Sequence, residues 1–215
     1  MFTFALTALL YPVVATPAVL LTPVAWTRVA LSEAVFGLAL GLCIQFVFEG
    51  AQLAGQIGGF QFAFSLVNVI DPQSNVDTPV LSVFHQLLVL LLFLQLNVHH
   101  WMLRGLVKSF EYAPPGSLAL APLAAKELLH DAGAIWVAGV QLATPILLAT
   151  VLIDVTVGFL SKAAPQMSAI FLSIPLKSLV GYGVLAVTLS MWPTFFEKEF
   201  AQALGWTERL LRVAH

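Results

Sequence analysis

Charged side chains are scarce in this sequence of 215 residues. Asp, Glu, Lys and Arg together make up only 9% of it, while 60% of the residues are hydrophobic. A soluble domain has roughly 25% charged residues, and a much smaller share cannot cover a surface that faces water. Lipid or partner subunits must therefore cover much of the chain, which predicts an integral membrane protein.

Basic residues and cysteine are also few, and this excludes several classes of function. The net charge is −2, so no basic face is available for nucleic acid. Cys43 is the single cysteine, so the sequence forms no internal disulfide and no cysteine-based metal site. Met1–Thr27 contains no Lys or Arg, so it does not have the basic segment of a typical signal peptide.

Long apolar runs take the place of charge. A helix that spans a bilayer needs roughly 20 apolar residues. Five runs reach or approach this length: Phe2–Leu21, Arg28–Ser65, Val80–Val98, Ala132–Leu160, and Pro175–Trp192, which Pro193 ends. The sequence therefore predicts an all-α integral membrane protein built from long helices and helical hairpins.

The connection His99–Asp131 has a mixed character. Its first part carries Arg104, Lys108 and Glu111, which suit a helix at the membrane interface. Pro114-Pro115-Gly116 then breaks this helix. We expect Ala121–His130 to form a second short helix at the membrane surface.

One face of the second run is polar. Gln45, Glu49, Gln52 and Gln56 recur at helical spacing, and at about 100° per residue they lie within roughly 60° of each other. A polar stripe in apolar surroundings must face water, a cavity or a polar partner. The stripe either lines a polar interior or forms hydrogen bonds with neighbouring helices.

A stripe of glycines lies beside the polar one. Its members are Gly37, Gly41, Gly55 and Gly59. Glycine lets the backbone of another helix come close, as in many membrane proteins. The two stripes together predict a helix that packs into an assembly of several helices.

Asp154 lies in the middle of the fourth run. A carboxylate at bilayer depth costs about 2.5–3.5 kcal/mol on the insertion scale, so it should be paired, protonated or exposed to water. A proton relay is one interpretation, and a packing contact with a partner subunit is the other. We favour the packing contact, because no second buried acid or His is near in the sequence.

No set of residues predicts a catalytic or metal centre. The sequence shows no nucleophile paired with a base, and Gly55–Gly59 lacks the Lys and the Ser or Thr of a phosphate loop. His99 and His100 are adjacent and cannot both point one way from a helix. We therefore expect no enzymatic activity, no cofactor and no metal.

The stretch from Phe60 to Leu66 alternates bulky apolar residues with small or polar ones. Such period-two spacing does not suit a continuing helix. An aromatic loop beside a polar helix face could seal a pore. It could equally be a loop end that packs into neighbouring helices, and the spacing alone leaves both open.

Three blocks of residues, in order, resemble a known family. They are Ala54–Gln61 with Asp71-Pro72-Gln73 and Thr78–Leu81; Leu92–Leu94 with Asn97–Trp101 and Pro114–Gly116; and Gly158–Met167 with Pro175-Leu176. The sequence in this respect resembles the FliR family, the R-type export-gate proteins of the flagellar type III secretion system. The resemblance runs from about Tyr11 to Pro193.

This resemblance implies a function. The chain would be a structural subunit of the type III export gate in flagellar biosynthesis, in the bacterial inner membrane at the flagellar basal body. It would join P-type and Q-type subunits and the B-type switch protein in a helical assembly surrounded by lipid. Unfolded export substrates would cross the membrane through its channel.

The resemblance also implies a division of the single membrane domain 1–215. Residues 1–131 would be the P-type-like part, 132–193 the Q-type-like hairpin and 194–215 a tail. A plug loop over 62–78 would seal the pore with Phe62, Phe64, Leu66, Asp71 and Pro72. Family members usually begin with a further apolar helix, and this chain begins within what resembles the second one.

A multi-pass secondary transporter is the alternative function. It predicts internal repeats and broken helices around a site near the middle of the membrane. The sequence has Pro145 and Asp154 inside one run but no internal repeat.

Overall fold

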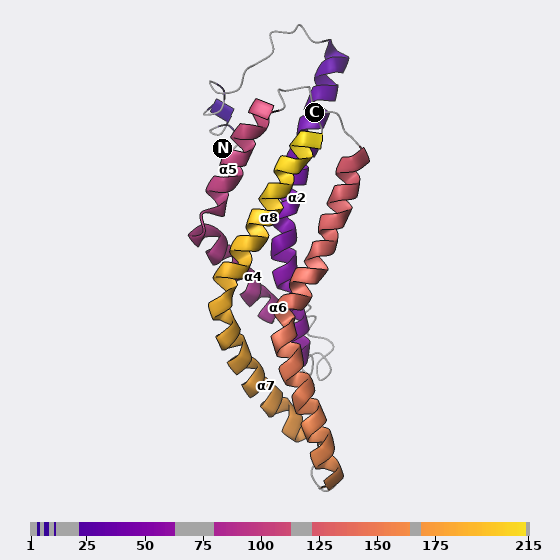
Figure 1. Cartoon of the computed structure of the whole chain (residues 1–215), viewed down its shortest axis with the longest axis vertical. Helices are drawn as coiled ribbons and strands as arrows, with labels where there is room; N and C mark the ends of the chain where they lie inside the picture. The colour runs from indigo at the N-terminus through magenta and orange to yellow at the C-terminus, as the bar shows by residue number, and fades with distance from the viewer. Residues whose placement is uncertain are drawn as a thin grey trace. The chain divides into compact units, whose positions relative to one another are not determined.

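The computed structural model describes residues 4, 7, 8, 11, 22–62, 80–112, 122–163 and 169–213. Its elements, in chain order, are α2 (Pro23–Gln61), α4 (Val80–Gln95), α5 (Val98–Tyr112), α6 (Pro122–Ala163), α7 (Ala169–Thr188), the 3-10 turn η1 (Leu189–Met191) and α8 (Trp192–Val213) (Figure 1). The described residues contain no strand. The predicted all-α fold is confirmed.

Three stretches are long and apolar enough to cross a membrane. They are Pro23–Gln61, Ala132–Ala163 and Leu172–Gly205, the last of which joins α7, η1 and the first part of α8. The pair of α4 and α5 qualifies as a fourth, broken span, with a bend of 63° between its two helices. The chain is thus an all-α membrane protein, as the apolar runs predicted.

Two of the helices are much longer than a bilayer requires. Helix α2 has 39 residues and α6 has 42. At the usual rise per residue these helices measure about 58 and 63 Å. The hydrocarbon core of a bilayer is only about 30 Å thick. Both helices therefore extend well beyond it.

Proline does not end helices where the sequence suggested. We predicted that Pro193 ends the last apolar run, but it is the second residue of α8, which follows α7 through η1. A proline in the first turn of a helix removes only an N–H group that has no intrahelical partner there. The expected tail from residue 194 is accordingly helical to Val213.

The predicted surface helix Ala121–His130 is also wrong as a separate element. Pro122 begins α6, and this helix continues without interruption through Pro145 to Ala163. The expected helix with Arg104 and Lys108 is present as α5.

The bend between α4 and α5 centres on Asn97. Its φ of 56° lies in the left-handed region, which Asn tolerates better than most residues with a side chain. The backbone N–H of Asn97 donates to the carbonyl of Leu94 at 3.1 Å, which closes the end of α4. Asn97 thus allows the chain to turn sharply between two helices.

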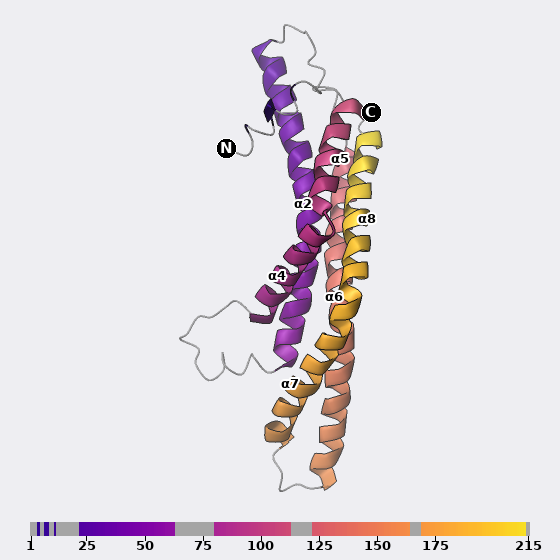
Figure 2. The same ribbon diagram turned by 90° about the vertical axis from the view of Figure 1, so that its left-hand side faces the viewer.

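The chain divides into two compact units, each built from segments far apart in the sequence. Unit 1 comprises Met1–Phe46, Phe93–Ala132 and Lys198–His215, and unit 2 comprises Val47–Leu92 and Gly133–Glu197. Within unit 2, α6 and α7 run in opposite directions, and the end of α6 lies alongside the start of α7 (Figures 1 and 2).

The core of unit 2 combines small residues of α2 with larger ones of the other helices. Ala51 and Ala54 are fully buried, and Val89, Ile146 and Phe196 are at most 1% exposed. Small side chains on α2 let the neighbouring helices approach its backbone. Unit 1 has a smaller aromatic contact, in which the rings of Phe93 and Phe200 lie 5.6 Å apart.

Candidate functional site: a helix junction in unit 2

Helices α2 and α4 meet at Gly55. A Cβ atom at this position would lie 2.6 Å from the Cα of Ser82 and 2.8 Å from the carbonyl oxygen of Leu81. Backbone atoms cannot rotate away as a side chain can, so any larger residue would push the two helices apart. At Gly58, about one turn later, a Cβ would lie 3.0 Å from Cδ2 of Leu81. Gly55 and Gly58 thus form the seat for α4.

Two side chains of α4 bond to the backbone of α2 beside this seat. The hydroxyl of Ser82 donates to the carbonyl oxygen of Gln52 at 2.9 Å, and Nδ1 of His85 lies 3.2 Å from the carbonyl oxygen of Ala51. Because a carbonyl only accepts, the His85 bond forms when Nδ1 carries the proton. These bonds fix the register of α4 on α2.

His85 is enclosed on its other side by an aromatic ring. It is 1% exposed, and the ring of Trp192 stands edge-on to it at 4.8 Å and 88°. Its Nε2 has no hydrogen-bond partner among the described residues. Sequence reasoning did not single out His85, because it lies within the apolar run Val80–Val98.

Phe62, which directly follows the last residue of α2, packs onto α7. It is 3% exposed, and its ring occupies the space in which a Cβ at Gly181 would otherwise sit. The ring of Tyr182 flanks it at 5.0 Å. The hydroxyl of Ser178 donates to the carbonyl oxygen of Phe62 at 3.1 Å. Phe62, which we expected in a pore plug, is therefore buried within its own chain.

A second pair of glycines brings α2 against α6. A Cβ at Gly139 would lie 2.7 Å from Cδ2 of Leu53 and 3.0 Å from the carbonyl oxygen of Gly50. A Cβ at Gly50 would lie 3.3 Å from that of Ala138. Neither glycine belongs to the stripe that the sequence indicated. Their signal was present in the spacing of Gly50, Ala54 and Gly58 along α2.

Asp154 forms an ion pair across the α6–α7 hairpin. Its Oδ1 lies 2.7 Å from Nζ of Lys177, and the side chains are 51% and 18% exposed, respectively. We expected its contact to come from a partner subunit, and the structure supplies a partner from the same chain. Nothing in the linear sequence connects these two residues, so only the hairpin brings them together.

The two predicted stripes on α2 are exposed towards the start of the helix and more buried towards its end. Gln45 is exposed, whereas Glu49, Gln52 and Gln56 are half-buried. Of the glycines, Gly55 and Gly59 are buried. At Gly37 and Gly41 a Cβ would meet nothing within 4 Å. The structure thus brings Gly55 against a neighbouring helix and leaves Gly37 and Gly41 open.

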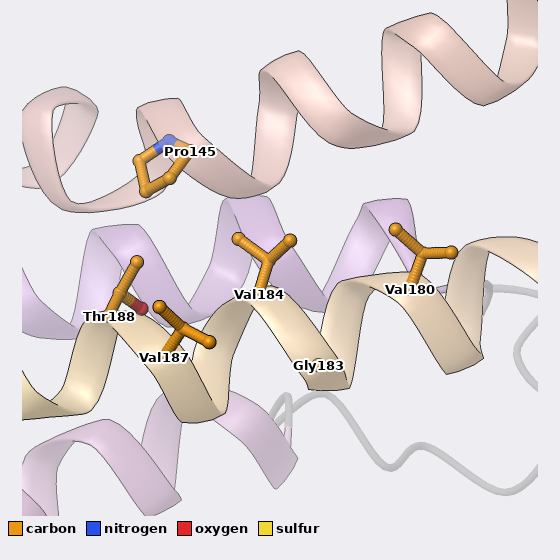
Figure 3. Close-up of a pocket in the computed structure, with 6 residues that line it drawn as sticks. All are labelled: Pro145, Val180, Gly183, Val184, Val187 and Thr188. Carbon is orange, nitrogen blue, oxygen red and sulfur yellow. The ribbon is translucent and has the colours of Figure 1, made fainter.

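An apolar groove runs between α6 and α7. It has a volume of about 520 Å³ and is lined by Pro145 of α6 and by Val180, Gly183, Val184, Val187 and Thr188 of α7 (Figure 3). Thr188 supplies its only polar side chain, and that hydroxyl donates to the carbonyl of Leu185 at 2.9 Å. The groove offers shape and apolar contact but no reactive group.

The remaining predicted plug residues, Phe64, Leu66, Asp71 and Pro72, lie outside the described residues. Among the residues that are described, no group of three or more His, Cys, Asp or Glu side chains could hold a metal ion. The contacts described above for unit 2 are those of helix packing: glycine seats, hydrogen bonds to backbone carbonyls and the Asp154–Lys177 ion pair.

The helices and these contacts define a multi-pass helical membrane protein whose distinctive residues hold helices together. The chain belongs to the family of bacterial export proteins, family 1, whose sequence model matches residues 1–203. The predicted resemblance to the FliR family is thereby confirmed.

Individual relatives agree with this assignment. The chain is 32% identical over 173 residues to the flagellar biosynthetic protein FliR of Escherichia coli K12, covering 80% of this chain and 66% of that protein. It is 32% identical over 169 residues to FliR of Bacillus subtilis 168, covering 75% and 64%. FliR of Pectobacterium carotovorum is 30% identical over 179 residues, covering 83% and 69%. The chain thus spans about two thirds of the length of these relatives.

Proposed function

We propose that this chain is a structural, non-enzymatic subunit of the type III protein export gate in flagellar biosynthesis. The observation that carries the proposal is family membership over residues 1–203, together with relatives named as flagellar biosynthetic proteins. The subunit sits in the bacterial inner membrane, at the flagellar basal body. There it helps to form the channel for unfolded export substrates.

Exposed apolar side chains support a role inside a larger assembly. On α6, exposed apolar side chains extend from Trp136, 65% exposed, to Phe159, 71% exposed, a distance of about 35 Å along the helix. Lipid can cover such side chains only within the hydrocarbon core, which is about half as long as α6. Exposed apolar surface outside that core needs protein partners. P-type and Q-type subunits, with the B-type switch protein, are the partners that we propose.

Co-expression tests the proposal directly. The chain, carrying an affinity tag, is produced either alone or together with P-type and Q-type subunits, and the purified material is weighed by native mass spectrometry. We expect a defined complex with several P- and Q-type chains, and aggregation or degradation of the chain alone. A monodisperse, stable monomer that does not bind these subunits would contradict the proposed function.

We also propose that residues 62–78 contribute the seal of the closed channel. The segment is rich in bulky apolar groups, Phe64 and Leu66 among them, and a narrow apolar constriction resists wetting by ions and water. The polar residues Asp71 and Asn75 with Pro72 suit a loop. The finding that Phe62 is buried within the chain shifts the sealing role to the residues that follow it.

Membrane conductance tests the seal. Cells carry wild-type protein, the Phe64→Gly/Leu66→Gly variant, or Phe60→Ala as a control, since Phe60 lies in α2 and is 68% exposed. At matched levels of assembled complex, we expect ion leakage with the double variant alone. A double variant as tight as wild type would show that the barrier lies in another subunit.

A further inference from the structure

The end of α2 is held by a second helix through contacts of two kinds. The carbonyl oxygen of Phe62 accepts a hydrogen bond from Ser178, and its ring lies on Gly181. We infer that the face of α7 formed by Ser178, Gly181 and Tyr182 is an anchor site, and that Phe62 is its fixed occupant. In this role Phe62 is a positioning residue that sets where α2 ends, and it does not face the channel.

The hydrogen bond from Ser178 satisfies a backbone carbonyl group at the end of α2. The last carbonyl groups of a helix have no intrahelical partner and require another donor. At the end of α2 the backbone N–H of Phe62 still donates to the carbonyl of Gly58 at 3.0 Å. Its own carbonyl takes its donor from Ser178 at 3.1 Å, a residue 116 positions away in the sequence. Helix α2 is thus closed by a side chain of α7.

The packing of the Phe62 ring on α7 depends on Gly181. At Gly181 any Cβ would overlap the ring of Phe62, whereas at Gly183 a Cβ would meet nothing within 4 Å. Tyr182 closes the flank of the ring at 5.0 Å. The space at Gly181 is therefore shaped for a large flat side chain, and Phe62 fills it to 3% exposure.

The anchor rests on a braced helix. Lys177 directly precedes Ser178 and pairs with Asp154 of α6 at 2.7 Å. The carbonyl oxygens of Phe62 and Ile174, each 3.1 Å away, share the single hydroxyl proton of Ser178, and the bond within its own helix orients the side chain. Phe62 thus packs on a segment of α7 that is itself paired with α6.

The two aromatic residues at this end of α2 accordingly have different roles. Phe60 is 68% exposed and Phe62 is 3% exposed, although they stand two positions apart. The functional consequence rests on the proposed function: the anchor fixes the point from which the chain leaves α2 towards the proposed seal. The anchor itself is a matter of contacts within the chain and can be tested separately.

A reversible cross-link tests whether the anchor is present and fixed. Phe62→Cys and Gly181→Cys are combined with Cys43→Ser in the co-expressed complex, and a short bifunctional thiol reagent with a reducible link is added before gel electrophoresis without reductant. The ring of Phe62 bridges the space between its own Cβ and the Gly181 position, so a short linker between two cysteine thiols can take its place, whereas a direct disulfide would need Cβ atoms about 3.5–4.5 Å apart. We expect efficient cross-linking, and none for Phe60→Cys with Gly181→Cys.

The same cross-link distinguishes a fixed anchor from a moving one. A fixed anchor predicts that cross-linked cells export flagellar proteins as well as cells in which the link has been reduced. Loss of export on cross-linking, recovered on reduction, would overturn the inference, because position 62 would then have to leave position 181 during transport. Failure to cross-link in an assembled complex would also overturn it.

A matched glycine pair gives a second, independent measurement. Gly181→Val should lower the amount of inserted, protease-resistant chain, while Gly183→Val should leave it unchanged, since position 183 has free space within the chain. Adding Phe62→Ala to Gly181→Val removes the overlapping ring and should restore the amount of protease-resistant chain. Equal tolerance of both valines, or no restoration, contradicts the anchor. If the wild-type complex itself does not form, the proposed function fails, and the cross-link in the isolated chain still tests the anchor.

Discussion

Unit 2 and the first half of α2, which lies in unit 1, differ in how far they supply their own packing partners. In unit 2, Gly50, Gly55 and Gly58 each face atoms of another helix, and α4 donates hydrogen bonds to α2. In the first half of α2, Gly37 and Gly41 face open space. Val24, Leu31 and Leu38 there are 77%, 61% and 65% exposed.

The difference shows what a glycine spacing does and does not specify. Gly37 and Gly41 have the same four-residue spacing as Gly55 and Gly59 on the same helix. The spacing permits close approach of a backbone, but it does not say which chain provides that backbone. Under the proposed function, the open glycines in the first half of α2 are where another subunit packs.

Breaking the ion pair in unit 2 should have the largest effect. Asp154→Leu leaves Lys177, only 18% exposed, without its carboxylate partner. An unpaired charge at bilayer depth costs about 2.5–3.5 kcal/mol on the insertion scale. We expect Asp154→Leu to lower the amount of inserted, protease-resistant chain strongly, and Asp154→Asn to do so less, because Asn can still accept a hydrogen bond from Lys177.

The charge-reversed pair is the control for this prediction. Asp154→Lys with Lys177→Asp restores opposite charges on the two helices and should recover most of the inserted chain. If Asp154→Asn instead allows assembly but abolishes export, the carboxylate has a protonation role that the pair alone does not explain.

The substitution Gly→Ala should lower the stability of the chain at Gly55 and raise it at Gly37. At Gly55 the new Cβ would lie 2.6 Å from a backbone atom, and overpacking of this kind costs about 1–3 kcal/mol. At Gly37 it meets nothing, and the higher helix propensity of Ala adds up to about 1 kcal/mol. The amount of inserted, protease-resistant chain measures the effect of both substitutions.

Gly37→Ala further tests the idea that the open glycines receive a partner helix. A variant chain that is inserted normally but recovered poorly in the complex would support an intersubunit contact at this glycine. Full recovery of the complex would mean that Gly37 faces lipid or water.

Thiol labelling should separate two exposed positions in the part of α2 that belongs to unit 1. Leu38 and Gln45 are two turns apart and differ by about 20° around the helix, so they lie on the same face. In a Cys43→Ser background within the assembled complex, we expect Gln45→Cys to react with a hydrophilic thiol reagent faster than Leu38→Cys. Equal, slow reaction at both would indicate that the polar stripe is packed against other helices there.

The smallest expected effect is that of a single hydroxyl in unit 2. Ser82→Ala removes the hydrogen bond to Gln52 but leaves the Gly55 seat intact. A hydrogen bond of this type contributes about 1 kcal/mol, and less when its acceptor has another donor. We expect a small decrease in the unfolding temperature of the complex, with export unchanged. A loss of assembly as large as that of Gly55→Ala would show that hydrogen bonding, not close packing, holds α4 on α2.

The helices themselves were predictable to a large extent, and their ends were not. Apolar runs identified α2, α4, α6 and α7, because burial of long apolar segments needs a helix in lipid. Pro193 was misjudged, since a proline in the first turn of a helix is as acceptable as one beyond its end. Local sequence does not distinguish these two cases.

The site was predictable only where a single residue type carries the information. Gly55 could be chosen in advance as a position of close approach, because only glycine leaves room for a neighbouring backbone. The partners of His85, Asp154 and Phe62 could not, since they come from residues between 23 and 120 positions away. Phe62 in particular belongs to a regular aromatic alternation, yet it is buried beside exposed Phe60.

Composition and the order of its apolar runs determined by themselves that this chain is a helical membrane protein, because 9% charge cannot form a water-facing surface. The motifs in those runs determined its family. Only the tertiary structure decided that Asp154 pairs with Lys177, that α4 sits on Gly55 and that α7 holds Phe62. These contacts depend on which helix faces meet, and a helix sequence specifies its faces but not its neighbours.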